Sequence, residues 1–224
     1  DGRLERIANG VAIDRFAQPV AEDAVPGLHR REGEVVIGTI AGLRAVKNLP
    51  RLVRAFAAMK MKNARLVIVG EGPESEAIVA EARRCGVADR LVLPGFLPDA
   101  ALYAARFDIF ALSSDSEQFP ISLVEAMAAG LPAVTTAVGD VLAMVSPDNR
   151  PLIVSPADEA AFAAGLDTLA ERPDLRRTIG RANRERAVAE YDEANMIARY
   201  GRLYGEALGA PLTFLAARAG DGGA

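Results

Sequence analysis

The stretch DIFALSSDSEQFPISLVEAMAAGLPAVTT, residues 108–136, establishes the kind of fold this chain adopts. It opens with a short apolar run at residues 108–112 and continues through a polar loop into residues whose apolar side chains recur at helical spacing. A β-branched run follows at residues 133–136. The order predicts a strand, a helix and a second strand. Because a helix connects the two strands, we expect them to be parallel and joined by a right-handed crossover.

The same alternation extends over most of the chain on both sides of this stretch. Strands are predicted at residues 35–41, 65–69, 91–93, 108–112, 133–136 and 152–154, with helices in most of the intervals. The sequence therefore predicts the α/β class, as a Rossmann-like three-layer α/β/α domain around a six-stranded, mainly parallel sheet. Ligands of such sheets bind beyond the carboxyl ends of the strands, so the functional residues are expected in the loops found there.

Helices take over after Pro156. Three are predicted, each with an Asp as its cap, at residues 158–172, 174–190 and 192–208. The last helix is amphipathic, and its stripe is either core packing or a surface for another domain. The stripe consists of Met196, Ile197, Tyr200, Leu203, Tyr204 and Ala207.

The domain is placed at residues 35–208. Residues 1–34 are expected to carry no element beyond an extended piece near Ile7. Residues 209–224 form a tail whose last five residues, 220–224, are expected to be mobile. The sequence begins at Asp1 and not at Met, which suggests a fragment or a trimmed product.

Composition narrows the classes of function. The 26 basic and 30 acidic residues give a formal charge of −4, so there is no electrostatic reason to bind nucleic acid or an anionic membrane. No apolar run approaches the roughly 18 residues of a membrane span. Cys85 is the only cysteine, so we expect a cytoplasmic protein, with Cys85 as a buried spacer and the lone His29 as a surface residue.

The loop after the first predicted strand carries two cations. It reads AGLRAVKN over residues 41–48 and enters a helix, so Gly42, Arg44 and Lys47 lie near the positive end of a helix dipole. This combination suits a phosphate group. The alternative is that Arg44 and Lys47 are solvated surface charges.

The loop after the second predicted strand reads GEGP over residues 70–73. Gly70 and Gly72 permit a tight turn, but the third glycine of a dinucleotide-binding fingerprint is absent. The turn either lets the backbone pass close to a ligand or is a plain connection from strand to helix.

The loop after residues 108–112 offers two acids. Glu117 lies in the polar loop, whereas Glu125 lies more than one turn inside the helix among apolar neighbours. A buried carboxylate needs partners, which the hydroxyls of a sugar or ribose supply, and the backbone N–H groups of residues 119–122 are placed to meet a phosphate. The alternative is that Glu117 is an exposed loop acid and Glu125 a helix-surface charge.

These loops resemble the retaining GT-B glycosyltransferases of family four, the group 1 glycosyl transferases, whose carboxyl-terminal domains bind the nucleotide-sugar donor. The resemblance spans nearly the whole chain. It covers the linker-like residues 7–16 (IANGVAIDRF), the phosphate loop at 38–48, the turn at 67–73, the loop beside the base at 95–97, and residues 117–132. The last match, a Glu-x7-Glu motif continued through AMAAGLP, is the most specific.

The resemblance implies a role for each matching residue. Glu117 holds hydroxyls of the transferred sugar, Glu125 holds ribose hydroxyls, and Lys47 neutralises the diphosphate, with Glu117 and Lys47 as the catalytic pair. The donor-binding set also includes Gly42, Arg44, Gly70, Gly72, Gly95, Phe96, Leu97, Gln118, Phe119, Pro120, Ile121 and Ser122. The implied donor is a UDP- or GDP-sugar, with no metal and no cofactor.

The chain departs from the family pattern at three positions. Gly42 stands where the family usually has Arg, Ala12 replaces an Asp, and Gln118 stands where many relatives have Gly. A charge-assisted phosphate contact is worth roughly 1.5–3 kcal/mol, so Gly42 is expected to weaken donor binding.

The resemblance implies that the chain is one half of a GT-B fold, the donor-binding domain of a hexosyltransferase. The acceptor is then bound by an amino-terminal domain absent from this sequence, so the chain alone is expected not to complete the transfer. One alternative is a non-catalytic GT-B-like module that binds a partner protein, and a weaker one is a sugar-nucleotide epimerase. An exposed stripe on the last helix would also favour self-association.

Overall fold

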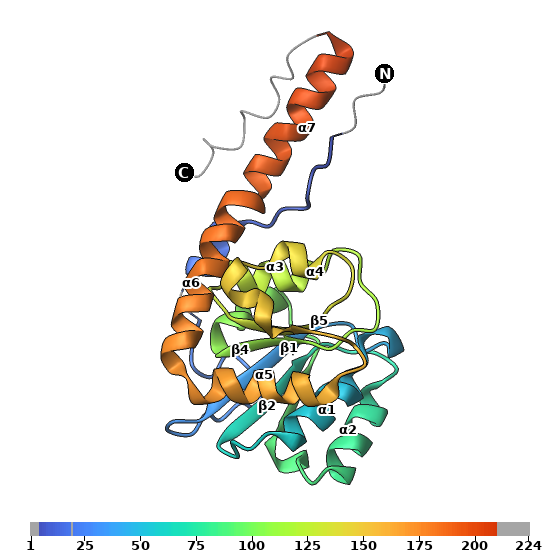
Figure 1. Ribbon diagram of the computed structural model, residues 1–224, viewed down its shortest axis with the longest axis vertical. Helices are drawn as coiled ribbons and strands as arrows, with labels where there is room; N and C mark the ends of the chain where they lie inside the picture. The colour runs from blue at the N-terminus through green and yellow to red at the C-terminus, as the bar shows by residue number, and fades with distance from the viewer. Residues whose placement is uncertain (1–4, 19, 210–224) are drawn as a thin grey trace.

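Six parallel strands form one sheet at the centre of the structure, a computed structural model that describes residues 5–18 and 20–209 (Figure 1). The strands lie in the order β3-β2-β1-β4-β5-β6. Their bounds are β1 (Val35–Ile40), β2 (Ala64–Val69), β3 (Leu91–Gly95), β4 (Ile109–Leu112), β5 (Ala133–Thr136) and β6 (Ile153–Val154). Strands β1 and β4 are neighbours in the sheet, although β2 and β3 lie between them in the sequence, so the strand order reverses at this point. Such a switch point opens a crevice at the carboxyl ends of the strands.

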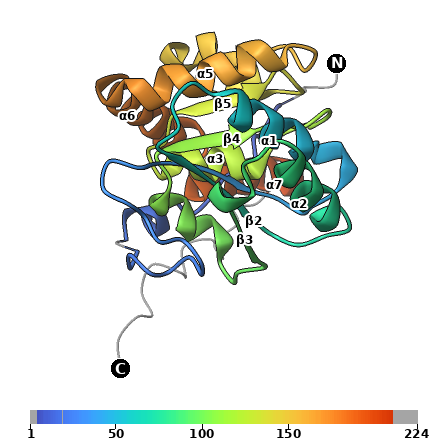
Figure 2. The ribbon, with the colours of Figure 1, turned by 90° about the horizontal axis from the view of Figure 1, so that it is seen from below.

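Helices cover both faces of the sheet, which explains why β1 and β2 are almost continuously apolar and buried. One face carries α1 (Leu49–Ala58), α2 (Ser75–Arg84) and α5 (Glu159–Glu171), which pack side by side (Figure 2). The other carries α3 (Ile121–Ala128) and α4 (Val141–Met144). The last two helices of the described residues are α6 (Pro173–Glu190) and α7 (Glu193–Leu208). The predicted three-layer α/β/α class is confirmed.

The predicted strands agree with the observed ones to within about two residues at each end, and the three final helices agree to within one. The predicted Asp caps are confirmed for α5 and α7. The Asp158 side chain accepts a hydrogen bond from the N–H of Ala161, and the Asp192 side chain accepts one from the N–H of Ala194. The cap predicted for α6 is wrong, because Pro173 occupies its first turn and the helix begins ahead of Asp174. Proline favours that position because its φ is already helical.

The amino-terminal segment is more ordered than predicted. Residues Ile13–Ala17 form a short 3-10 helix, η1, and Val11 forms a parallel bridge with Asp192. The N–H of Val11 donates to the carbonyl of Tyr191 at 2.8 Å, and the N–H of Glu193 donates to the carbonyl of Val11 at 3.0 Å. The partner of this segment lies about 180 residues away in the sequence, so no local pattern could reveal it.

Helix α7 extends away from the sheet and its layers (Figure 1). Its apolar stripe is exposed: Ile197, Tyr200, Leu203 and Tyr204 are 38–55% accessible to solvent. The core-packing interpretation of the stripe is therefore wrong. Cys85, expected to be buried, is only half-buried, whereas His29 is exposed as predicted.

Among the described residues, no helix combines the length and the apolar character that crossing a membrane requires. The tail predicted at 209–224 lies outside the described residues beyond Gly209, so its expected mobility stays a prediction.

Candidate functional site

Two strand-end loops pack directly against each other at the carboxyl edge of the sheet. The N–H of Leu43 donates to the carbonyl of Glu71 at 2.9 Å, and the N–H of Glu74 donates to the carbonyl of Leu43 at 3.0 Å. A Cβ at Gly70 would stand 1.9 Å from the carbonyl oxygen of Ala41, and one at Gly72 would stand 2.5 Å from that of Leu43. The two glycines therefore permit loop-to-loop packing, a role that neither sequence interpretation of this turn included.

Lys47 and Glu117 form an ion pair between two of these loops. The Lys47 Nζ donates to Glu117 Oε1 at 2.6 Å, and the Ser114 hydroxyl donates to the same oxygen at 2.7 Å. The side chains of Lys47 and Glu117 are only 25% and 12% exposed. The structure thus brings together the two residues that the resemblance makes catalytic, and neither is a solvated surface charge.

Backbone contacts hold the Lys47 loop against the loop after β4. Lys47 ends a 3-10 turn, η2 (Ala45–Lys47), and Asn48 follows in the left-handed conformation before α1 begins. The Ser113 hydroxyl donates to the carbonyls of Lys47 and Asn48, both at 3.0 Å, and the N–H of Asp115 donates to the carbonyl of Val46 at 2.8 Å. These bonds fix the backbone of the Lys47 loop relative to the loop that carries Glu117.

The other cation of this loop is Arg44. Gly42 and Arg44 are both exposed. The Arg44 Nε lies 3.6 Å from the place where a Cβ on Gly42 would stand, an ordinary contact distance. The Arg44 side chain therefore folds back towards the position that lacks the family's Arg.

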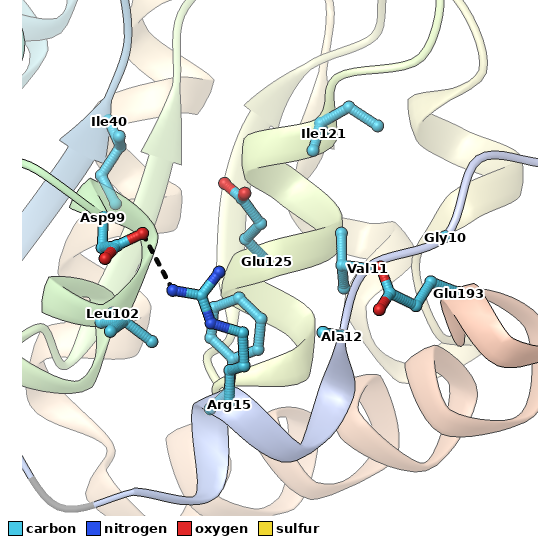
Figure 3. A pocket seen from close by; sticks show the side chains of 11 residues that line it. Gly10, Val11, Ala12, Arg15, Ile40, Asp99, Leu102, Ile121, Glu125 and Glu193 are labelled. Carbon is cyan, nitrogen blue, oxygen red and sulfur yellow. Dashed lines mark hydrogen bonds and ion pairs between the residues drawn. The ribbon is translucent and has the colours of Figure 1, made fainter. Parts of the chain in front are cut away.

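Glu125 lines a separate cavity of about 500 Å³ beside the end of β1 (Figure 3). It projects from α3 one turn after Ile121, and both side chains face this cavity. Burial raises the pKa of the Glu125 carboxyl, and the nearby Arg15 guanidinium opposes that rise in part. Within residues 5–18 and 20–209 no hydrogen bond satisfies the carboxylate. It is a partly buried acceptor with unused capacity.

The opposite wall of this cavity comes from segments far away in the sequence. Arg15 of η1 donates to the carboxylate of Asp99 at 2.9 Å, and this pair forms the wall of the cavity that faces Glu125 (Figure 3). Gly10, Val11, Ala12, Phe16, Ile40, Leu102 and Glu193 complete the lining. Glu117 is not among the lining residues, so the two acids of the Glu-x7-Glu motif occupy two different places.

The first turn of α3 connects those two places along the chain, after Glu117 and before Glu125. Pro120 caps the helix and has no N–H of its own, and the N–H of Leu123 already donates to the Pro120 carbonyl at 3.1 Å. The N–H groups of Ile121 and Ser122 lie in the first turn, where a helix has no acceptor to offer. The preceding loop is held by Gln118, whose carbonyl accepts from the N–H of Asp140 at 2.9 Å, and by Phe119, whose ring meets Tyr191 edge-on.

The loop after β3 presents an aromatic side chain to solvent. Phe96 is 65% exposed, whereas the next residue, Leu97, is buried. The carbonyl of Gly95 accepts a hydrogen bond from the N–H of Gly70 at 2.9 Å, so this loop joins the two described above.

Sequence reasoning did not assign a function to three residues of this region. Arg15 stands next to Phe16 in the linker-like stretch, and Ser114 stands three residues before Glu117, a spacing that allows a local hydrogen bond. Asp99 gave no signal, because only the fold brings it to Arg15. In the described part of the chain, no three His, Cys, Asp or Glu side chains are grouped to hold a metal ion.

Comparison with known proteins gives a family. A family model described as Glycosyl transferases group 1 matches residues 21–186. The N-acetyl-alpha-D-glucosaminyl L-malate synthase of Bacillus anthracis is 28% identical over 79% of this chain and 47% of its own length. The 2-deoxystreptamine N-acetyl-D-glucosaminyltransferase of Streptomyces fradiae is 32% identical over 78% of this chain and 46% of its own length. The chain spans about half the length of these curated relatives.

Solved structures show the same architecture. Sucrose-phosphate synthase from Thermosynechococcus elongatus superposes with a TM-score of 0.81 at 26% identity, covering 93% of this chain and 54% of that one. Anabaena Alr3699/HepE in complex with UDP-glucose superposes with a TM-score of 0.79 at 22% identity, covering 89% of this chain and 57% of that one. At such identity the second likeness concerns the fold alone.

Proposed function

The chain belongs to the glycosyl transferases group 1 family, and we propose that it is the part of such an enzyme that binds the nucleotide-diphosphate-sugar donor. The observation that carries this proposal is Glu125, a partly buried carboxylate with a raised pKa, facing a cavity of about 500 Å³ with no partner in the described chain. A pair of ribose hydroxyls would supply the donors it lacks.

The base of the nucleotide lies next to the ribose in this proposal, against the loop after β3. The exposed Phe96 ring offers a stacking surface, with Gly95 and Leu97 shaping the backbone on either side. UDP is the first candidate, and the Anabaena structure of the same fold was obtained in complex with UDP-glucose. GDP is the second.

The diphosphate belongs at the amino end of α3, facing Lys47. The first-turn N–H groups of Ile121 and Ser122 and the positive end of the helix dipole favour an anion there. When the sugar–phosphate bond breaks, negative charge builds on the leaving diphosphate, and fixed donors stabilise that charge without reorganising. Glu117, beside Lys47, then holds hydroxyls of the transferred sugar. Arg44 supplies part of the positive charge that an Arg at position 42 would bring to the diphosphate.

A whole enzyme needs a site for the acceptor as well. Since the chain spans about half of its relatives, we place that site on a further, amino-terminal domain that completes a GT-B fold. In this scheme residues 1–34 link the domains and residues 35–208 bind the donor. The transferred group is a hexose, anomeric configuration is retained, no metal takes part, and the protein works in the cytoplasm. This chain alone then has no transfer activity.

Calorimetry tests donor binding directly. Titrating the 224-residue chain with UDP, GDP, UDP-glucose, UDP-galactose, UDP-N-acetylglucosamine and GDP-mannose should show weak binding of at least one nucleotide. Glu125→Ala should lower that affinity by about tenfold to a hundredfold, since charge-assisted hydrogen bonds are lost. Glu185→Ala, an exposed acid on α6, serves as the matched control and should change nothing. If the unmodified chain binds none of these nucleotides, the proposal is wrong.

The second candidate is a non-catalytic module that kept the fold and binds a partner protein. Two observations favour it: Gly42 in place of a phosphate-binding Arg, and the exposed apolar stripe of α7. Gly42→Arg separates the two candidates, because only a donor-binding domain gains nucleotide affinity from the added cation.

A further inference from the structure

The two hydrogen bonds to Glu117 fall on the same carboxylate oxygen. Lys47 Nζ and Ser114 Oγ both donate to Oε1, at 2.6 and 2.7 Å. Among residues 5–18 and 20–209, no hydrogen bond reaches Oε2. The carboxylate is therefore fixed at one oxygen, and its second oxygen keeps its full capacity to accept.

The two donors differ in how firmly they are held. Ser114 is 1% exposed, has a single side-chain torsion, and its carbonyl accepts a hydrogen bond from the hydroxyl of the buried Thr136 at 2.6 Å. Lys47 ends a long flexible side chain that is 25% exposed. Ser114 is the rigid partner of Glu117, and Lys47 is the partner that can move away.

We propose that Ser114 is a positioning residue for sugar recognition: it holds Oε1 of Glu117 so that Oε2 faces a hydroxyl of the donor sugar. This inference rests on the proposed function. When a diphosphate draws Lys47 towards its own oxygens, the Glu117 carboxylate loses one of its two partners. The Ser114 hydroxyl then remains on Oε1, so the carboxylate keeps its orientation at the moment the sugar must be held.

The neighbouring serine shows what a purely structural hydroxyl does in this loop. Ser113 is equally buried, but its hydroxyl donates to the backbone carbonyls of Lys47 and Asn48 and so fixes one loop to another. The Ser114 hydroxyl instead donates to a side chain that is itself the candidate sugar ligand. Its removal therefore affects the orientation of one carboxylate more than the folding of the chain.

The measurement is the sugar increment, defined as the Kd for the free nucleoside diphosphate divided by the Kd for the best-bound nucleotide sugar of the panel above. Ser114→Ala should reduce this increment by about fivefold to twentyfold while leaving the affinity for the nucleoside diphosphate within about twofold. Ser116→Ala removes an exposed hydroxyl from the same loop and should leave both affinities unchanged. A purely structural role would weaken both ligands together and lower the melting temperature.

A double-mutant cycle with Glu117→Ala keeps the result interpretable if Ser114→Ala alone weakens the fold. If Ser114 acts through Glu117, then Ser114→Ala should no longer change the increment once Glu117 is Ala. The inference is overturned if Ser114→Ala leaves the increment intact, if it still lowers the increment in the Glu117→Ala chain, or if the unmodified chain binds the diphosphate but gains nothing from the sugar. Absence of all nucleotide binding would instead reject the proposed function.

Discussion

At the scale of single residues, Glu125 shows a conflict between stability and binding. Burial raises the pKa of its carboxyl, so between the ordinary value of 4.5 and the raised value the folded chain binds more protons than the unfolded chain. The free energy of unfolding therefore falls as pH rises through that interval, and the cost of the buried charge is fully present above it. A ligand that supplies hydrogen-bond donors to the carboxylate offsets this cost.

The first prediction concerns pH. Nucleotide affinity should rise as pH increases through the raised pKa of Glu125 and level off above it, because the ionised form accepts from both ribose hydroxyls. Calorimetry at a series of pH values from 4.5 upward, in buffers of different ionisation enthalpy, should detect proton release on binding in the interval above the ordinary pKa of 4.5. Glu125→Gln should bind weakly at every pH, without that release, and should unfold at higher temperature than the unmodified chain at pH 7. A pH-independent affinity of the unmodified chain would contradict this account.

The second prediction concerns Gly42, which is exposed and has room for a side chain because its Cβ position meets only Arg44 Nε at 3.6 Å. Gly42→Arg should raise affinity for a nucleoside diphosphate by about tenfold to a hundredfold, and the gain should shrink at high salt. Gly42→Gln has a long polar side chain without the charge and serves as the control. If Gly42→Arg leaves nucleotide affinity unchanged, the partner-binding alternative is favoured.

At the scale of elements, the geometry of the site depends on loops that hold each other. The loop after β1 is fixed on one side by the loop after β2 and on the other by the loop after β4. Lys47 is thus placed by backbone contacts with two other connections. A substitution in the loop after β2 or in the loop after β4 should therefore displace Lys47, even where the substituted residue contacts no charged group.

The third prediction tests this arrangement with two glycines of positive φ. A Cβ at Gly70 would collide with the carbonyl of Ala41 at 1.9 Å, whereas a Cβ at Gly86 would meet no atom within 4 Å. Gly86→Ala should therefore cost only the backbone strain, about 1 kcal/mol, and leave nucleotide binding intact. Gly70→Ala should cost about 2–4 kcal/mol in urea unfolding and weaken binding by moving the Lys47 loop. Equal costs at both positions would show that the two loops separate freely.

At the scale of the whole molecule, α7 leaves an apolar stripe in contact with solvent. Tyr204 in this stripe is 55% exposed, and Tyr200 stacks on it with ring centroids 6.2 Å apart. Leu208, one helical turn beyond Tyr204, extends the apolar surface and is 70% exposed. An exposed apolar patch of this kind usually belongs to an interface. Under the proposed function, the surface that covers this stripe would belong to the acceptor domain.

The fourth prediction follows for the chain on its own. Sedimentation velocity should show self-association that grows with protein concentration, and Tyr204→Glu combined with Leu208→Glu should abolish it without lowering the melting temperature, since both side chains are exposed. Asn195→Glu adds charge to the opposite side of α7 and should leave the association unchanged. A chain that stays monomeric at every concentration would show that the stripe does not bind a second copy.

Local patterns account for much of what was predicted correctly. Strand positions follow from short β-branched runs, and the parallel sheet follows from a helix between each pair, because both depend on residues close in the sequence. The interval between Glu117 and Glu125 places one acid before α3 and the other inside it for the same reason. The loop glycines were found by their spacing, although their packing role was not.

Contacts between segments that are distant in the sequence account for the features of the site that local patterns did not predict. The Lys47–Glu117 pair joins residues 70 apart, and the Arg15–Asp99 pair joins residues 84 apart. The bridge from Val11 to Asp192 spans nearly the whole described chain. The order of residues thus determined which elements form and which loops gather at one edge of the sheet. Folding determined which side chains meet there, because burial, hydrogen-bond partners and charge pairs depend on distances in space that local patterns along the chain do not contain.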